Sequence, residues 1–365
     1  GQSRFIEAAV TDVRYESGFR AVYTVRLRSV DGKAEGSKGL LLSDSSRELT
    51  VGDTIECGAV FVPLGEVYSF YDMSKYDMMA GGNYFACETD GDFKLTGKTG
   101  GIEIFFSHLG RRLCAAVSLY LGKDASALSR ALLLADRSDL DVTFINRDFM
   151  RIGASHLLAL SGLHLAVLCG MLDFLALKLG APKKLRSVLS IAFVVFYMFL
   201  TAFPYSVVRS GIMVILLQIV GILGFDRDPI TALFTAGTLI LLCDPPASFD
   251  IGFEMSFAAT LGVLVMSDSS NRLLRLKFRR MIKKFKPAKY LRSVASGLLV
   301  TLGALMFIIP LQWLHFGETS LLTPVSTLLL TPLCELLLWL LPFYMLACEF
   351  AFRRDGRACV GARCA

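Results

Sequence analysis

The stretch SHLLALSGLH, residues 155–164, places two histidines, two serines and a glycine at the start of a long apolar run. Ser161 and His164 are three residues apart and therefore share one face of a helix. A hydroxyl beside an imidazole can act as nucleophile and general base, but two side chains on one helix are too weak a pair to indicate a hydrolase. The polar residues need another explanation, because the segment otherwise reads as a membrane helix.

More polar side chains lie inside the apolar tracts: His156, Asp173, Arg209, Glu254, Ser256, Gln312 and His315. A charge inside a bilayer costs several kcal/mol, so such residues usually face a bundle interior or a wet cavity. If the tracts that begin at residues 155, 206 and 249 enter from one face, Arg209 and Glu254 both lie within roughly 8 Å of it. We therefore expect an Arg209–Glu254 ion pair in a polar vestibule that narrows toward His164. The alternative is that the two side chains only tie two helices together.

Several common catalytic signatures are missing from the sequence. It contains no GxxxxGK[ST] phosphate loop, no HExxH motif and no paired carboxylates of specific spacing. The nine cysteines show no tight zinc-ligand spacing. We therefore expect no enzyme activity, no ATP hydrolysis, no cofactor and no metal site. Cys57 and Cys87 either pair as a disulfide, if their part of the chain lies outside the cell, or remain two buried free thiols.

The composition changes along the chain, which is 54% hydrophobic and 19% charged. Residues 1 to about 150 are an ordinary soluble mixture, and apolar tracts recur after them. Residues 4–96 alternate apolar and polar side chains between Gly-rich breaks, which predicts short β-strands in a small barrel or sandwich. Residues 102–150 have a helical period but are too polar to span, so we expect amphipathic helices on the membrane surface or against a bundle.

Seven apolar tracts follow, and about 20 residues suffice to cross a bilayer. The candidate spans are residues 155–179, 187–203, 206–224, 230–243, 249–266, 294–316 and 320–350. The last tract contains Pro324, Pro332 and Pro342, so it forms one kinked span, two spans or a re-entrant element.

The basic residues predict the orientation of these spans. They follow the first span, the fifth span and the last, and the group after the fifth, Arg272 to Arg292, holds ten Lys or Arg and no acid. With seven crossings all three groups lie on one side, which the positive-inside rule makes cytoplasmic. The β domain is then outside, whereas splitting the last tract would move the C-terminus outside. The ten-cation block is either a topology signal that touches anionic lipid or a phosphate-binding surface.

The stretch FMRIGASHLLALSGLHLAVL, residues 149–168, resembles the signature of the ComEC competence-protein family. ALLLADRSDL, SVVRSGIMV, DPPASFDIGFEMSFAATLGV and IIPLQWLHFGETSLLTPVSTLLLTP resemble further family segments, and the N-terminal part is similar to the family's OB-like domain. The resemblance implies a polytopic α-helical membrane bundle with an N-terminal all-β OB-like domain. The expected parts are residues 1–100 as the soluble outer domain, 101–152 as interfacial helices, 153–352 as the transmembrane domain and 353–365 as a short basic tail.

The resemblance also implies a function, a channel component that carries single-stranded DNA across the cytoplasmic membrane in natural transformation. Its channel residues would be Gly153, His156, Ser161, Gly162, His164, Arg209, Glu254 and Ser256. We name Arg20, Arg26, Arg28, Arg279, Arg280, Lys283 and Lys284 as candidate contacts to DNA, with Tyr68, Phe70 and Tyr71 as candidate stacking partners. The expected partners are single-stranded DNA, the lipid bilayer, an external DNA receptor and a cytoplasmic ATPase, with a homo-oligomer as one arrangement.

The sequence departs from the family pattern at two points. Glu254 stands where the family usually has Gln, which favours an ion pair with Arg209. The chain ends at residue 365 without the metallo-β-lactamase-like domain of many family members, and it opens on Gly within strand-like sequence, so we expect an upstream membrane anchor to be missing. The alternatives to a DNA channel are a small-solute transporter, an intramembrane enzyme that uses Ser161 and His164, and a non-functional fragment of a larger DNA-uptake protein.

Overall fold

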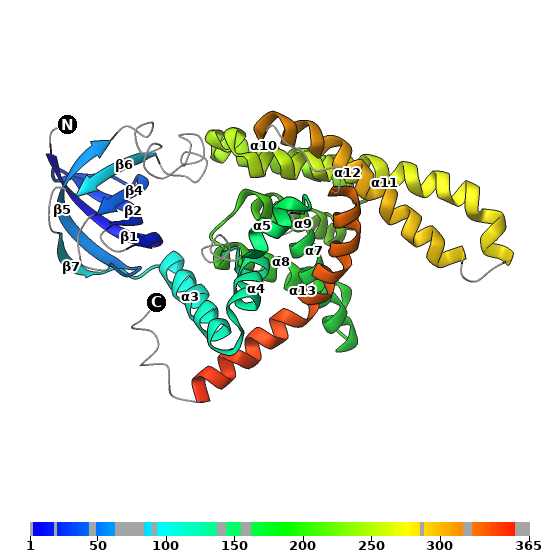
Figure 1. Ribbon diagram of the computed structural model, residues 1–365, viewed down its shortest axis with the longest axis horizontal. Coiled ribbons are helices and arrows are strands. Elements are labelled where there is room, and N and C mark those ends of the chain that lie inside the picture. Colours follow the sequence, from blue (N-terminus) through cyan, green and yellow to red (C-terminus); the bar gives the residue numbers. More distant parts are fainter. Residues whose placement is uncertain are drawn as a thin grey trace. The chain divides into compact units, whose positions relative to one another are not determined.

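In the computed structural model the chain forms two compact units (Figure 1). The first unit contains Gly1–Ala115, Phe199–Ala202 and Cys243–Asp250, and the second contains Ala116–Met198, Phe203–Leu242 and Ile251–Ala365. The structure describes residues 3–17, 20–43, 49–62, 84–89, 93–136, 144–154, 162–284, 288–316 and 323–354.

The first unit is built on a β-barrel. Five of its strands pair in the closed order β1-β2-β4-β6-β5 and back to β1, with β3 added to β2 and β7 added to β5. The pairing of β4 with β6 is parallel, and the other pairings are antiparallel. The strands are β1 (Ser3–Ser17), β2 (Arg20–Val30), β3 (Lys33–Ala34), β4 (Lys38–Ser43), β5 (Asp53–Val62), β6 (Phe85–Thr89) and β7 (Lys94–Lys98). The sequence was compatible with either a barrel or a sandwich, and the structure is a barrel.

The strand alternation explains the barrel core. Ala21, Tyr23, Val25 and Leu27, which the sequence places on one face of β2, are all buried in the same apolar cluster. A second, smaller cluster joins Val22, Leu40, Leu42 and Ala86. These residues alternate with those of the first cluster along β2, β4 and β6, so both faces of this part of the sheet are packed.

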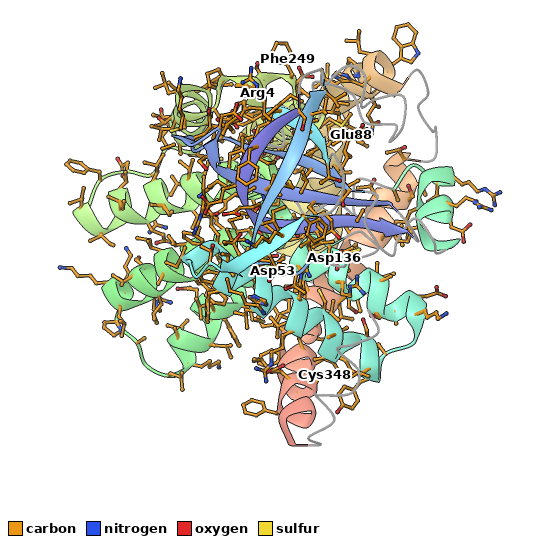
Figure 2. The ribbon with its side chains drawn as sticks, turned by 90° about the vertical axis from the view of Figure 1, so that its left-hand side faces the viewer. Arg4, Asp53, Glu88, Asp136, Phe249 and Cys348 are labelled. Atoms are coloured by element: carbon orange, nitrogen blue, oxygen red, sulfur yellow. The ribbon has the colours of Figure 1, made fainter. Side chains whose placement is uncertain are left out.

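A turn before β5 sets the start of that strand. Gly52 has a φ of +94°, a conformation that favours glycine. Asp53, labelled in Figure 2, accepts hydrogen bonds from the backbone N and the Oγ1 of Thr50 at 2.7 and 2.8 Å. The GD pair that the sequence places ahead of an alternating run therefore forms a closed turn at the start of β5.

Three helices follow the barrel: α3 (Ile102–Tyr120), α4 (Lys123–Leu134) and α5 (Phe144–Arg151). Within the first unit, the start of α3 packs beside the barrel, where Gly52 lies close to Ile104 and His108. Phe106 of α3 stacks on Phe199, which comes from the end of a helix nearly a hundred residues later. Segments far apart in the sequence therefore complete the first unit.

The remaining helices are α7 (Gly162–Lys178), α8 (Lys183–Leu200), α9 (Tyr205–Leu223), α10 (Pro229–Cys243), the 3-10 turn η1 (Pro245–Phe249), α11 (Ile251–Lys284), α12 (Ala288–Phe316) and α13 (Thr323–Arg354). Figure 1 draws α11 and α12 as a long pair that crosses closely. The last apolar tract is one helix, α13, with Pro332 and Pro342 inside it. Of the alternatives that the sequence left open, the structure has a single helical segment.

Two helices are long and apolar enough to cross a membrane, Tyr205–Leu223 in α9 and Val325–Phe350 in α13. Three shorter apolar segments accompany them, Pro229–Cys243, Ile251–Ser267 and Leu299–His315. Both numbers of helices refer to the residues that the structure describes. Length and composition therefore allow membrane crossings, and the expectation of seven spans stays a prediction.

Candidate functional site

The side chain of Arg209 is buried at a junction of three helices. It comes from α9, and only 4% of the residue is exposed. Its Nη1 donates a hydrogen bond to Oγ1 of Thr260 on α11 and lies 3.8 Å from Sδ of Met213. Its Cζ lies 5.7 Å from the centre of the Phe257 ring, in the range of a cation–π contact. All of these contacts are to neutral groups.

Gly162 of α7 makes room for this guanidinium. A Cβ added at Gly162 would lie 2.6 Å from Nη2 of Arg209 and 3.2 Å from Cβ of Ser210, and the first distance is shorter than real contacts allow. A methyl group at residue 162 would therefore displace the Arg209 guanidinium and press on Ser210. The Gly of the SGLH element and the Arg of the later span, both named from the sequence, meet at one point.

The structure corrects the expected Arg209–Glu254 ion pair. Glu254 of α11 instead pairs with His315 of α12, with 2.7 Å between Oε2 and Nε2. Arg209 reaches Thr260, which lies six residues beyond Glu254, or about 9 Å along the helix. Both predicted side chains take part in contacts between helices, but with different partners.

The other predicted channel residues have varied settings. His164 of α7 is buried, at 2% exposed. Ser256 of α11 accepts a hydrogen bond at its backbone oxygen from the Thr260 hydroxyl at 2.8 Å, so it supports the residue that binds Arg209. His156 and Ser161 lie outside the described residues. Asp173 pairs with Arg186 of α8 at 3.2 Å.

Gly153 ends a helix. Its φ of +69° is left-handed, and Ala154 donates back to the carbonyl of Phe149 at 2.8 Å, as at a typical helix C-terminus. Ala154 is fully buried beside Cys334 of α13. The Ser326 hydroxyl donates to the Ile152 carbonyl at 2.7 Å. The residues on either side of Gly153 therefore dock the end of α5 onto α13.

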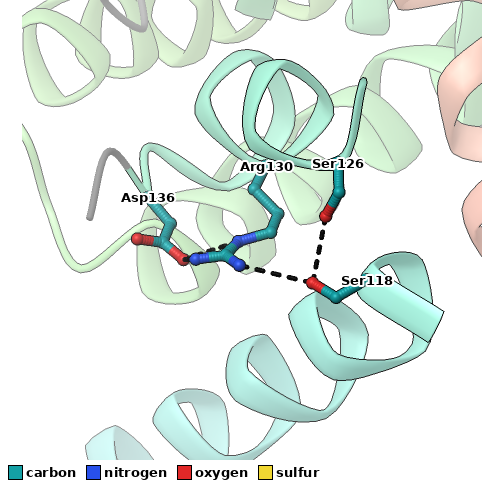
Figure 3. A network of polar contacts seen from close by, with 4 residues as sticks. All are labelled: Ser118, Ser126, Arg130 and Asp136. Carbon is teal, nitrogen blue, oxygen red and sulfur yellow. Dashed lines mark hydrogen bonds and ion pairs between the residues drawn. The ribbon is translucent and has the colours of Figure 1, made fainter. Parts of the chain in front are cut away.

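Sequence reasoning missed a polar network around Arg130 of α4, shown in Figure 3. Nε and Nη2 of Arg130 donate to one oxygen of Asp136 at 3.0 and 2.7 Å, and Nη1 donates to Oγ of Ser118 at 3.3 Å. Ser118 and Ser126 share a further hydrogen bond of 3.0 Å. This network fixes the chain just after α4, where Ala135 has a φ of +60°. The carboxylate in the quoted ALLLADRSDL stretch was the available signal.

A second missed contact ties α8 to the same region. The Tyr197 hydroxyl donates to the backbone oxygen of Leu133 at 2.9 Å. Leu133 lies in the last turn of α4, where carbonyl groups have no partner within the helix. The end of α4 is therefore satisfied by a side chain from α8.

The barrel residues named as DNA contacts are engaged within the first unit. Arg26 forms an ion pair of 3.2 Å with Glu103, and Arg28 donates to Thr99 at 2.8 Å and lies 3.6 Å from Glu7. Both arginine side chains are nearly half exposed. The side chains of Arg20, Arg279, Arg280, Lys283 and Lys284 are outside the described part of the structure, as are Tyr68, Phe70 and Tyr71.

The part of the chain that the structure describes contains no group of three or more His, Cys, Asp or Glu side chains that could hold a metal ion. Cys57 and Cys87 are both free thiols in the barrel core, the second of the two alternatives that the sequence left open.

The chain combines a small β-barrel with apolar helices that bury an arginine and a histidine. It therefore belongs to the class of proteins that hold polar side chains among apolar helices. The chain belongs to the family described as Competence protein, which matches residues 132–359. It is 24% identical over 224 residues to "ComE operon protein 3" of Bacillus subtilis (strain 168), and 30% identical over 195 residues to an "Uncharacterized protein" of Aquifex aeolicus (strain VF5).

These alignments cover only part of each relative. The first covers 61% of this chain and 26% of the Bacillus protein, and the second covers 53% of this chain and 40% of the Aquifex protein. No solved structure matches the chain.

Proposed function

We propose that the chain is a component of a conduit that carries single-stranded DNA across the cytoplasmic membrane in natural transformation. The observation that carries this proposal is the competence-family match over residues 132–359, which contains all of α7 to α13. In this proposal the chain catalyses no reaction. An external DNA receptor and a cytoplasmic ATPase act in trans, and the conduit assembles from one chain or several copies.

The surface of the second unit supports a place in the membrane. Large apolar side chains are exposed along α13: Leu329, Leu333, Leu336, Leu340 and Phe343. Soluble monomers rarely expose apolar patches of this kind, and lipid chains would cover them. The basic residues between α7 and α8, after the apolar part of α11 and at the end of α13 would face the cytoplasm, which leaves the barrel outside.

The barrel supports an OB-like domain at the outer face. Its closed ring of five strands, with one parallel pair, is compatible with the Greek-key barrel that binds single strands in OB-folds. Arg26 and Arg28 would reach phosphates by exchanging Glu103 and Glu7 for them. Their partial exposure allows this exchange, because exposed ion pairs contribute little stability.

DNA uptake tests the proposal directly. A naturally transformable strain that lacks its own competence-family channel is complemented with this chain and given labelled double-stranded DNA. We expect label to become resistant to external nuclease only in complemented cells. Label that stays nuclease-sensitive, although the chain is present in the membrane fraction, contradicts the proposed function.

A further inference from the structure

Two arginines of the second unit, the buried Arg209 and the partly buried Arg130, differ in how their charge is compensated. Arg130 gives three of its nitrogen atoms to Asp136 and Ser118 (Figure 3). Arg209 is paired with no carboxylate among the described residues: its Nη1 meets a hydroxyl and a thioether, and its Nε has no acceptor there. The positive charge of Arg130 is therefore balanced by a carboxylate, whereas that of Arg209 is not balanced by any described carboxylate.

A guanidinium buried without a carboxylate is unfavourable. Burial removes its hydration, and neutral acceptors and an aromatic face return only part of the lost free energy. An anion bound to Arg209 would offset this lost free energy, because charge-assisted hydrogen bonds are about twice as strong as neutral ones. The free Nε and the planar guanidinium suit an oxyanion with two acceptor oxygens.

The surroundings of Arg209 hold its side chain in place. Gly162 receives Nη2 against the α7 backbone, Phe257 covers the cation, and Thr260 fixes Nη1. Thr260 is itself held by the Ser256 carbonyl. These contacts come from α7 and α11, so the guanidinium lies where three helices meet and has little freedom to turn.

We infer that Arg209 binds a phosphodiester group of the DNA strand and that Gly162 positions it for this role. The inference rests on the proposed function, which supplies a polyanion. Since Arg209 is nearly fully buried in the structure, a phosphate would take the place of the Thr260 hydroxyl as α11 side chains move aside. One phosphate at a time would be bound at the junction of α7, α9 and α11.

Equilibrium binding of a fluorescein-labelled oligothymidine to the full chain in nanodiscs tests the inference. We expect Arg209→Gln to weaken binding by roughly tenfold to one-hundredfold, the effect of losing a charged hydrogen bond. The slope of log affinity against log salt should fall in magnitude by about 0.7, as for one lost phosphate contact on a single strand. Arg209→Lys keeps the charge and should keep the slope.

Matched variants separate binding from folding. Gly162→Ala places a methyl group against Nη2 and should reduce both affinity and slope, whereas Gly170→Ala on the same helix meets no atom within 4 Å and should change neither. Arg130→Gln removes a partly buried arginine that already has a carboxylate and should leave the slope unchanged. Monodisperse size-exclusion profiles identify the folded variants, and Gly162→Ala carries the test if Arg209→Gln does not fold.

The outcomes distinguish this inference from the proposed function. An unchanged salt slope in folded Arg209→Gln or Gly162→Ala, or no oligonucleotide binding by the unaltered chain, overturns the phosphodiester site. Arg209-dependent binding in a chain that fails to restore DNA uptake leaves the site standing and refutes the transport role. If the unaltered chain restores uptake and Arg209→Gln leaves the salt slope unchanged, the transport role stands and the phosphodiester site is refuted.

Discussion

Two thiols in the barrel core show how burial changes the chemistry of single residues. Burial raises the pKa of Cys57 from 9.0 to about 11, and burial together with the nearby Cys57 raises that of Cys87 to about 12. The unfolded chain therefore loses these protons at lower pH than the native chain. Their contribution to stability is complete below about pH 9 and is lost as the pH rises through about 11. We predict that iodoacetamide at about pH 8.5 leaves both thiols unmodified in native protein and modifies them after unfolding in guanidinium.

Cys243, which is exposed at the end of α10, is the internal control and should react in the native protein. Peptide mass spectrometry measures all three sites in one sample. Native modification of Cys57 or Cys87 at the rate of Cys243 would contradict the burial of the two thiols.

The sequence was informative about which residues are unusual and less so about their partners. It named Arg209, Glu254 and His315 because charged and polar side chains are costly in apolar helices. It paired Arg209 with Glu254 wrongly, because counting residues gives depth along a helix and not the direction in which a side chain points around it. Thr260 was missed, although it lies four residues after Ser256 on the same helix face.

At the scale of elements, the backbones of α11 and α12 approach each other closely at Gly262 and Gly303. A Cβ at Gly262 would overlap the carbonyl oxygen of Gly303, and a Cβ at Gly303 would lie 2.5 Å from Cβ of Met266. We predict that Gly262→Val forces the helices apart and destabilises the protein by about 1–3 kcal/mol, as for overpacking in other tight contacts. Thermal unfolding in detergent measures the change.

Gly170→Val is the matched control, because a side chain at Gly170 meets open space on α7. It should melt at or slightly above the temperature of the unaltered protein, since glycine weakens helices. Equal melting temperatures for Gly262→Val and Gly170→Val would show that the crossing is not tight.

The apolar tracts predicted the helices well where Gly, Pro or Asp separates them. The expected tract 206–224 is α9, Tyr205–Leu223, and 230–243 is α10, Pro229–Cys243. The tracts 249–266 and 294–316 became longer helices, α11 and α12. Hydropathy marks where a helix is apolar, and Leu, Lys and Arg continue it beyond that point because they are good helix formers.

At the scale of the whole molecule, the sequence predicted the order of a β-rich part before helices but not how the barrel closes. Closure depends on β4 pairing in parallel with β6 and on β5 pairing with β1, contacts between residues far apart in the chain. Alternation identifies each strand's inner face and says nothing about its neighbour. The addition of Phe199–Ala202 and Cys243–Asp250 to the first unit is long-range in the same way.

The single helix α13 leads to a prediction about sidedness. If each of the seven helices from α7 to α13 crosses the membrane once, the barrel and the end of α13 lie on opposite faces, with the barrel outside.

We predict that Lys98→Cys in β7 reacts with a membrane-impermeant maleimide in intact cells, and that Lys184→Cys, between α7 and the apolar part of α8, reacts only after permeabilisation. Both lysines are exposed, so access to reagent is matched within the protein, and replacing Cys243 with serine removes the native thiol that is exposed among the described cysteines. A fluorescent protein fused after Arg354 should fold and fluoresce in the cytoplasm. Labelling of both cysteines from the same side would contradict an odd number of crossings before α8. A C-terminal fusion that does not fluoresce would contradict a single crossing by α13.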